Sequence, residues 1–257
     1  MDKAMRYFNK LILPLFLSMV LLGCSSEDSV DAAGGGSGQG GSLARFTIAN
    51  NTLYTVFEDN IHVVDITNPA DPVSTGFAES RWQIETLFSR GDYLFLGTPF
   101  GMEVLDISNP FNPQYVSSFE HAFSCDPVVA DDEYAYVTLR SVGRRCGSIA
   151  SQLNIINVSD ITNPQLEHVH FMEEPYGLGI DGDLLFICDN GLKVYDRRSP
   201  ATLPLLQEFN IPAIDVIPLN GLLLVVAEDG LYQYRYANNE LTLLSKVDIL
   251  PAAGSTP

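Results

Sequence analysis

Short runs of alternating apolar and polar residues follow one another along most of the chain. Between residues 176 and 209 there are four such runs, YGLGI, LLFICD, LKVYD and LPLLQEF. Turn residues separate them, among them Asp181-Gly182-Asp183 and Asn190-Gly191. Asn-Gly and Asp-Gly pairs readily adopt the positive φ angles that tight hairpins need. This stretch therefore predicts four antiparallel strands joined mostly by short turns.

The same pattern recurs along the chain. The segment IHVVDITNPADPVSTGF begins at Ile61, MEVLDISNPFNPQYVSSF at Met102 and LNIINVSDITNPQLEHVHF at Leu153, and degenerate copies begin at Leu192 and Leu231. The equivalent positions are 65, 106, 157, 196 and 235, and the one long step contains the insertion SVGRRCGSIASQ. Four strands in a unit of about forty residues are typical of a propeller blade. The sequence predicts an all-β fold, a β-propeller of five four-stranded blades over residues 43–250. Closure into a ring would leave no blade face open, but the sequence does not show whether the ring closes.

Three copies carry a family resemblance. VVDITNPADPV, VLDISNPFNPQYV and INVSDITNPQL resemble the LVIVD repeat of bacterial and archaeal envelope proteins. The resemblance implies a propeller-like fold outside the cytoplasm and no common biochemical activity. The fifth unit departs from the repeat at Tyr234-Arg235-Tyr236. The recurring Asp65 and Asp106 are expected to fasten turns by accepting backbone N–H bonds, not to catalyse.

The N-terminus has the layout of a secretory signal. Lys3, Arg6 and Lys10 precede the apolar stretch LILPLFLSMVLLG, which is too short to span a bilayer as a helix. The following Leu21-Leu22-Gly23-Cys24 resembles the lipobox of bacterial lipoproteins. The resemblance implies that residues 1–23 are removed and that Cys24 carries acyl chains, palmitate among them. We therefore expect an outer-membrane lipoprotein of the cell envelope, facing the periplasm or the cell surface.

The segments flanking the repeats are expected to lack fixed structure. Residues 24–42 are rich in glycine and serine, and such a linker behaves as a flexible coil. Residues 251–257 are expected to form a disordered tail.

Composition and motifs argue against nucleic acids, metals and cofactors as ligands. The formal net charge of −18 repels phosphate backbones, so nucleic-acid binding is disfavoured. His168 and His170 alternate on one predicted strand, but a metal site would need a third ligand. No phosphate-cradling loop or G-x-S-x-G motif is present, and the sequence assigns neither a cofactor nor a metal. We expect a monomeric domain.

One end of the propeller is the predicted binding rim. Loops that enter the first strand of a blade and loops that join its second and third strands lie at the same end. Arginine and aromatic side chains, which are common at binding hot spots, gather in these loops. The candidates are Arg81, Trp82, Phe100, Phe123, Arg144, Arg145, Glu173 and Tyr176. The leading interpretation is a non-catalytic module that binds an envelope protein or glycan.

The alternative interpretation is an envelope glycan hydrolase. Such an enzyme needs two carboxyl groups about 5 to 10 Å apart. The carboxylates expected near the propeller axis are Glu85, Asp126, Glu174 and Asp215. Sequence spacing does not show which two would converge.

The cysteines after Cys24 suggest one disulfide. Cys125 and Cys146 flank the insertion, and an oxidising envelope permits a bond between them. Closing this loop would stabilise the fold by about 3 kcal/mol in the chain-entropy model. Cys188 is then left over, although a pairing that involves it stays open. A catalytic thiol is disfavoured because no histidine is placed to activate it.

Overall fold

The computed structural model describes residues 40–121, 127–141 and 150–249. Within these ranges all the regular secondary structure is β-strand, and no helix there could cross a membrane. The strands form five separate antiparallel sheets of four strands each. The prediction of five four-stranded blades is confirmed.

Each blade consists of four strands that are consecutive in the chain. Blade one contains β1 (Phe46–Ala49), β2 (Thr52–Phe57), β3 (Asn60–Asp65) and β4 (Val73–Glu79). Blade two contains β5 (Thr86–Arg90), β6 (Tyr93–Thr98), β7 (Gly101–Asp106) and β8 (Gln114–Glu120). Blade three contains β9 (Val128–Ala130), β10 (Tyr134–Leu139), β11 (Gln152–Asn157) and β12 (Gln165–Phe171). Blade four contains β13 (Pro175–Asp181), β14 (Leu184–Asp189), β15 (Leu192–Asp196) and β16 (Leu205–Phe209). Blade five contains β17 (Ala213–Leu219), β18 (Leu222–Ala227), β19 (Gly230–Ala237) and β20 (Glu240–Asp248).

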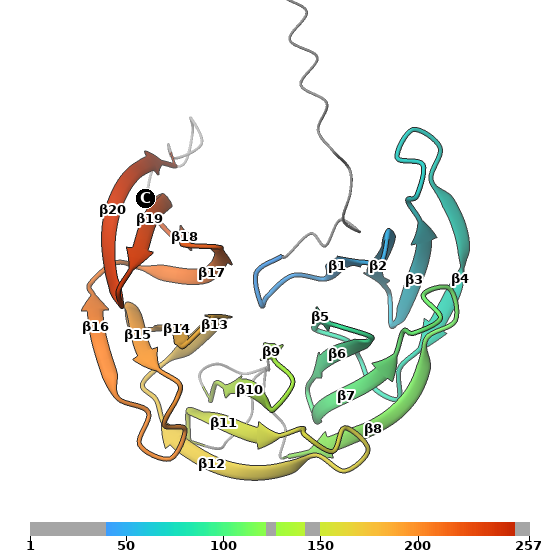
Figure 1. Cartoon of the computed structure of the whole chain (residues 1–257), viewed down its shortest axis with the longest axis horizontal. Coiled ribbons are helices and arrows are strands. Elements are labelled where there is room, and N and C mark those ends of the chain that lie inside the picture. Colours follow the sequence, from blue (N-terminus) through green and yellow to red (C-terminus); the bar gives the residue numbers. More distant parts are fainter. Residues whose placement is uncertain (1–39, 122–126, 142–149, 250–257) are drawn as a thin grey trace, which may run out of the picture. The chain divides into compact units, whose positions relative to one another are not determined.

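The blades are arranged around a common axis. Their first strands, β1, β5, β9, β13 and β17, lie innermost, and their fourth strands lie outermost (Figure 1). Among the described residues, no blade borrows a strand from the far end of the chain.

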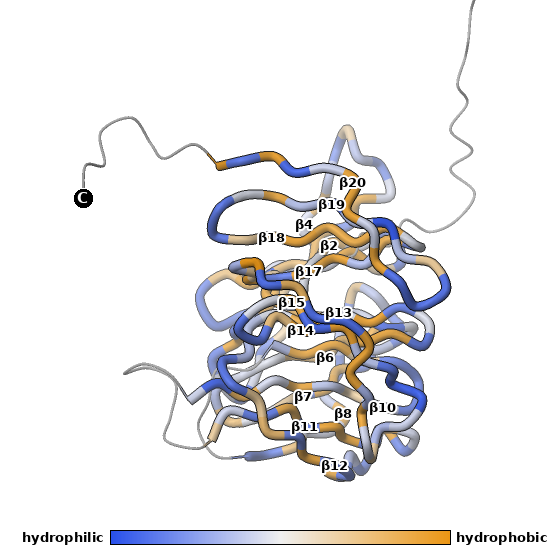
Figure 2. The backbone as a smooth tube through the Cα atoms, turned by 90° about the vertical axis from the view of Figure 1, so that its left-hand side faces the viewer, coloured by the Kyte–Doolittle hydropathy of each residue, from blue (hydrophilic) through white to orange (hydrophobic). Residues whose placement is uncertain are grey.

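Apolar side chains between neighbouring blades form the core. The second strands of blades two, three and four are buried almost throughout, because both of their faces meet another blade. Tyr54 and Ile61 of blade one, for example, pack with Leu94 of blade two. Figure 2 shows the hydrophobic strands and the more hydrophilic turns at their ends. Burying one large apolar side chain stabilises a fold by about 1.5–3 kcal/mol, so these junctions fix how the blades meet.

The recurring acid of the repeat fastens the turn after the third strand. The Oδ1 atoms of Asp65 and Asp106 accept the backbone N–H groups two residues ahead, at 2.8 and 2.7 Å. Asn157 and Asp196 make the same bond at 3.0 Å. The interpretation of these acids as turn fasteners is confirmed. The fifth unit has Arg235 at this position and continues its third strand to Ala237 instead.

The ring is open between blades five and one. The first strands of blades one to four each pack beside the first strand of the next blade, but β17 and β1 do not pack in this way. Figure 1 shows the separation between the two end blades. Here the strap, residues 41–44, crosses from blade one to its neighbours. Ser42 donates to Oδ1 of Asp215 in β17 at 3.1 Å and accepts the N–H of Leu178 in β13 at 2.7 Å.

Candidate functional site

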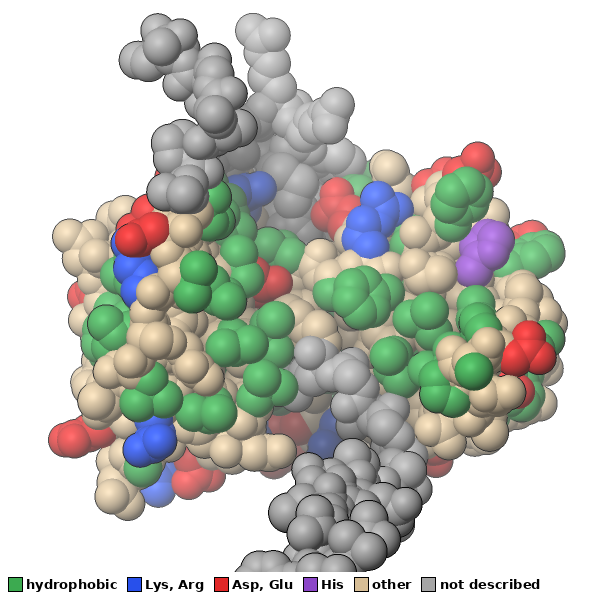
Figure 3. All heavy atoms as spheres, turned by 90° about the horizontal axis from the view of Figure 1, so that it is seen from above, with side chains coloured by type: hydrophobic (Ala, Val, Ile, Leu, Met, Phe, Trp, Pro, Cys, Tyr) green, Lys and Arg blue, Asp and Glu red, His purple; other side chains and the backbone are tan. Residues whose placement is uncertain are grey.

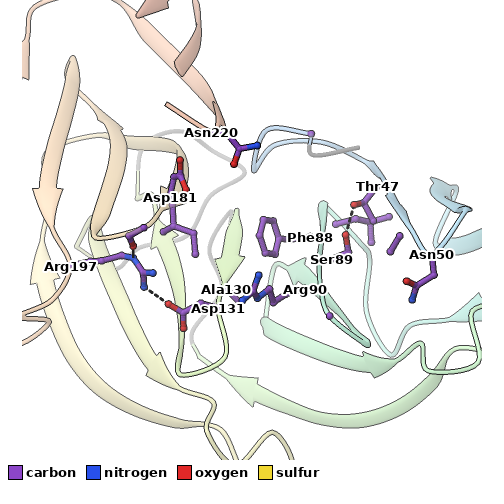
Figure 4. Close-up of a pocket in the computed structure, with 16 residues that line it drawn as sticks. Thr47, Asn50, Phe88, Ser89, Arg90, Ala130, Asp131, Asp181, Arg197 and Asn220 are labelled. Carbon is purple, nitrogen blue, oxygen red and sulfur yellow. Dashed lines mark hydrogen bonds and ion pairs between the residues drawn. The ribbon is translucent and has the colours of Figure 1, made fainter. Parts of the chain in front are cut away.

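A cavity of about 670 Å³ lies where the first hairpins of all five blades meet. Each blade contributes to its lining through the turn between its first and second strands, with Asn50, Arg90, Asp131, Asp181 and Asn220. Its volume falls within the range of about 300–1,000 Å³ that is common for small-molecule sites. Figure 4 shows these side chains around the cavity. We call it the axial pocket.

Turn chemistry explains why the lining is polar. Asn50, Asn220, Gly91 and Gly182 have φ angles between 48° and 54°, in the left-handed region that asparagine and glycine tolerate best. The turns therefore select asparagine in blades one and five and glycine in blades two and four, where Arg90 and Asp181 add polar side chains from the ends of β5 and β13. The third blade uses Asp131, whose Oδ1 accepts the N–H of Tyr134 at 2.7 Å and so closes the turn. The same residues that make the hairpins line the axial pocket.

A partly buried ion pair forms one wall. Arg197 pairs with Asp131, and only 20% and 17% of their side chains are exposed. Arg197 also donates through Nε to the carbonyl oxygen of Gly182 at 2.6 Å, and its guanidinium lies 6.0 Å from the ring centroid of Tyr136. Burial acts to raise the pKa of Asp131, but backbone N–H bonds and Arg197 outweigh it and the pKa is lowered. Asp131 is thus held as a carboxylate.

The remaining walls are also hydrogen-bonded. The hydroxyl groups of Thr47 and Ser89 lie 2.8 Å apart, as the dashed line in Figure 4 shows. Asp181 accepts a hydrogen bond from the hydroxyl of Tyr236. Burial and this bond raise the pKa of Tyr236, so its hydroxyl stays a donor. Phe88 adds an aromatic ring to the lining.

Arg90 is the exposed cation of the site. Half of its side chain (51%) is accessible, and its guanidinium contacts both carboxylate oxygens of Asp132 at 3.1 and 3.2 Å. It also lines a second cavity of about 440 Å³ beside the axial pocket. That cavity is otherwise lined by Asp131, Asp132, Glu133, Tyr134, Asp183, Arg197, Arg198 and Pro200. Exposed ion pairs are weak, so a ligand that offers a better acceptor can displace Asp132 from Arg90.

The predicted rim lies at the opposite end of the blades. Arg81 and Trp82 are in the loop that enters β5, and Phe100 is in the turn between β6 and β7. The guanidinium of Arg81 lies 4.7 Å from the ring centroid of Trp82, which is 6.0 Å from that of Phe100. Arg81 further contacts Tyr115 and Glu120 at 3.3 and 3.4 Å. The structure brings these three predicted rim residues together, and their role in binding stays a prediction.

The other rim candidates lie apart or outside the described residues. Glu173 contacts Asn190 at 2.9 Å and Lys193 at 3.4 Å, and these two partners lower its pKa. Tyr176 lies under the guanidinium of Arg140, at 4.0 Å from its ring centroid. The predicted rim residues Phe123, Arg144 and Arg145 lie outside the described residues.

The three described candidate catalytic carboxylates belong to different blades, and whether any two act together stays a prediction. Asp215 is buried and accepts hydrogen bonds from Ser42 and from the N–H groups of Leu43 and Val216 at 2.9 to 3.2 Å. Burial raises its pKa. Oε1 of Glu174 accepts the Tyr176 hydroxyl at 3.2 Å, Glu85 lies half-buried just before β5, and Asp126 lies outside the described residues. Asp215 therefore has a structural role at the strap.

The predicted disulfide partners Cys125 and Cys146 also lie outside the described residues. Cys188 is a buried free thiol in β14, and burial raises its pKa well above the usual value. Such a thiol is a poor nucleophile.

His170 bonds the carbonyl oxygen of Pro200 at 2.7 Å, and His168 lies 3.5 Å from Glu167. Among the residues that the structure describes, no group of three His, Cys, Asp or Glu side chains could hold a metal ion.

The axial pocket was not predicted from the sequence. The first hairpins had been assigned only a turn-forming role, although in every unit a polar residue stands at one of two adjacent positions there, as Asn50, Arg90, Asp131, Asp181 and Asn220 do. That periodic recurrence around a predicted axis was the available signal. No sequence signal pointed to Arg197 as part of the pocket, because it is 66 residues from its partner Asp131 in the chain.

Comparison with known proteins identifies the repeat and the fold. The LVIVD repeat pattern matches residues 41–77 and 88–121. No curated protein matches the sequence. Among solved structures, a functionally unknown protein from Desulfotomaculum acetoxidans is 11% identical, with a TM-score of 0.62 over 77% of this chain and 66% of the other. A protein from Lactobacillus plantarum is 16% identical, with a TM-score of 0.61 over 78% of this chain and 69% of the other. A periplasmic gluconolactonase from Pseudomonas aeruginosa is 12% identical, with a TM-score of 0.58 over 78% and 68%. The chain thus spans about two thirds of these proteins, and at such identities the likeness concerns the fold alone.

Proposed function

We propose that this chain, a five-bladed propeller that carries LVIVD repeats, is a non-catalytic binding module that takes a polyhydroxylated ligand such as a saccharide into the axial pocket. The supporting observation is the pocket itself, in which donors and acceptors from five blades converge on one space of about 670 Å³. The sequence predicts two classes of partner, an envelope protein or a glycan, and a saccharide belongs to the second.

The lining suits hydroxyl groups. Asn50 and Asn220 each offer an amide donor and an acceptor, and Thr47 and Ser89 offer hydroxyls. A sugar hydroxyl likewise both donates and accepts. Phe88 supplies an apolar surface for the C–H face of a sugar ring, and Arg90 supplies a charged donor.

Binding is favoured over catalysis because the pocket carboxylates are engaged. Asp131 is paired with Arg197, and Asp181 accepts from Tyr236. A general acid has to donate a proton to the substrate, and Asp131, whose pKa is lowered, is held in the ionised form that has no proton to donate. The alternative function is hydrolysis of a sugar lactone or a glycan, which the fold likeness to a gluconolactonase suggests. The experiment below distinguishes the two functions.

The test is a glycan-array screen of the full chain, followed by calorimetry with the best saccharide and with gluconolactone. We expect Arg90→Ala to weaken binding by about tenfold or more, the effect of one lost charge-assisted hydrogen bond. Arg81→Ala is the matched control, because its side chain is equally exposed (50% against 51%) and lies at the opposite end. If Arg81→Ala weakens binding and Arg90→Ala does not, the ligand site belongs to the rim. Turnover of either compound would favour the hydrolase.

The proposed location is the cell envelope, with acyl chains on Cys24 holding the module at a membrane. Two or more acyl chains anchor a protein stably, whereas one chain is marginal. The support is the lipobox-like stretch before Cys24 and the glycine- and serine-rich residues that follow it.

A further inference from the structure

The two end blades each have one face that is not buried by another blade. In blades two to four the second strand is buried on both sides. In β2 and β18 buried residues instead alternate with partly or fully exposed ones. Alternation of this kind means that only one side of the sheet meets a neighbour.

The uncovered face of blade one is apolar and aromatic. Phe46, Phe57 and Phe77 have 51%, 61% and 64% of their surface exposed. The strand register places Ile48, Leu53, Thr55, His62 and Val64 on the same face. The position in blade two that is equivalent to Phe46 is Leu87, which pairs across the strands with Leu96 as Phe46 pairs with Thr55. Leu87 is only 2% exposed because blade one covers it.

The uncovered face of blade five is aliphatic. Val226 and Leu231 are cross-strand partners and are 37% and 40% exposed, and Val247 beside them is 64% exposed. The equivalent cross-strand pair in blade four is Cys188 and Leu192, both fully buried against blade five. Terminal units of repeat proteins normally present a polar outer face to water. These two faces do not.

The two faces are the two halves of one kind of junction. In blades one to four, one face of the sheet packs against the next blade; in blade five the equivalent face is exposed. In blades two to five, the other face packs against the preceding blade; in blade one the equivalent face is exposed. Figure 3 shows apolar side chains on both flanks of the opening.

The strap bonds to blades on both sides of the opening. The carbonyl oxygen of Ala44 accepts the N–H of Leu87 in blade two at 2.9 Å, and Ser42 is bonded to Leu178 and Asp215 in blades four and five. A Cβ atom on Gly41 would lie 2.1 Å from a carboxylate oxygen of Asp215, so the strap is tightly seated. Closing the opening would also require the four buried junctions to shift together, and packed cores resist such deformation.

We infer that the face of blade five in one chain docks on the face of blade one in a second copy, continuing the packing between blades from chain to chain. A second copy is the occupant that the structure favours, because this chain carries both halves of a junction that it already forms four times internally. Such a head-to-tail contact is heterologous, so it gives either a closed assembly or an open chain of copies.

The test mixes two variants of the full chain, Phe57→Cys and Leu231→Cys, each with one cysteine added to the native four, under mild oxidation. Both positions lie beside the turn between the second and third strands of their blades. We expect a disulfide-linked pair in the mixture, well above what either variant gives alone. Phe111→Cys mixed with Leu231→Cys is the matched control, since Phe111 is 43% exposed but lies in the loop between β7 and β8.

Sedimentation of the unmodified chain supplies the second measurement. We expect assemblies of two or more copies, and at least tenfold weaker association for Phe57→Lys with an unchanged circular-dichroism spectrum. A chain that sediments as a monomer at all concentrations would overturn the inference. So would a Phe57→Cys/Leu231→Cys double variant whose disulfide forms only within one chain, because the opening then closes on itself.

Discussion

Arg197 joins blades three and four at the wall of the axial pocket, so its removal tests the interpretation of that wall. It pairs with Asp131, donates to the carbonyl oxygen of Gly182 and lies against the ring of Tyr136. Arg197→Ala removes all three contacts. It leaves Asp131 with its two backbone N–H bonds, from Glu133 and Tyr134, both at 2.7 Å.

The expected loss of stability is about 2–4 kcal/mol. A hydrogen bond to a charged group contributes about 1.5–3 kcal/mol, and two such bonds are lost. The remaining carboxylate is 17% exposed, so water and the two N–H groups compensate for part of the loss. In a domain of this size each kcal/mol lowers the melting temperature by about 2–4 °C.

The loss should also depend on pH. The lowered pKa of Asp131 means that its stabilising contribution is present above its unfolded-state pKa, near 3.9, and is lost as the pH falls through the lower folded-state pKa. Without Arg197 the folded-state pKa moves back up. The difference between the two proteins should therefore be largest at neutral pH and shrink below about pH 4.

Urea denaturation at neutral and acidic pH, followed by circular dichroism, measures both effects. The matched control is Arg198→Ala, because Arg198 is the next residue, is 57% exposed and pairs with Asp196. We expect its midpoint to stay close to that of the unmodified protein. Equal midpoints for Arg197→Ala and the unmodified protein, or an equal loss from the control, would refute the assignment of Arg197 as the link between the blades.

Three further predictions follow from named contacts. Gly177→Ala should destabilise the fold by about 1–3 kcal/mol, because its Cβ would lie 2.1 Å from Asp215; an unchanged urea midpoint would contradict this packing. Burial raises the pKa of Asp215, so its stabilising contribution is present below its unfolded-state pKa and is lost as the pH rises through the folded-state pKa. Asp215→Asn should thus gain in melting temperature relative to the unmodified protein as the pH rises above about 4, and parallel pH profiles would exclude this. Cys24→Ser should abolish incorporation of labelled palmitate and release the chain from the membrane fraction; continued labelling would place the lipid elsewhere.

The blades could be predicted from the sequence because their signals are local. Alternating apolar residues, Asn-Gly and Asp-Gly pairs and a recurring acid lie within each unit, and the hydrogen bonds of Asp65 and Asp196 are made to residues two positions ahead. Even the degenerate fifth unit keeps its turns at Asn220-Gly221 and Asp229-Gly230, and it folds as a blade.

The axial pocket and the open face could not be predicted in the same way. The pocket depends on five turns meeting around the axis and on Arg197 reaching Asp131 from the neighbouring blade. The opening depends on the angle between blades, which results from the packing of side chains such as Tyr54 and Leu94 at each junction. Neither the convergence nor the angle is visible in the pattern of a single repeat.

The central claim is that a ligand binds where the five first hairpins converge. Hydrogen–deuterium exchange of the full chain with and without its best saccharide tests this claim directly. We expect slower exchange in residues 49–52, 89–93, 130–134, 181–184 and 219–222, the turns that carry Asn50, Arg90, Asp131, Asp181 and Asn220. Protection confined to residues 80–82, 99–101 and 172–174, at the opposite end, would contradict it.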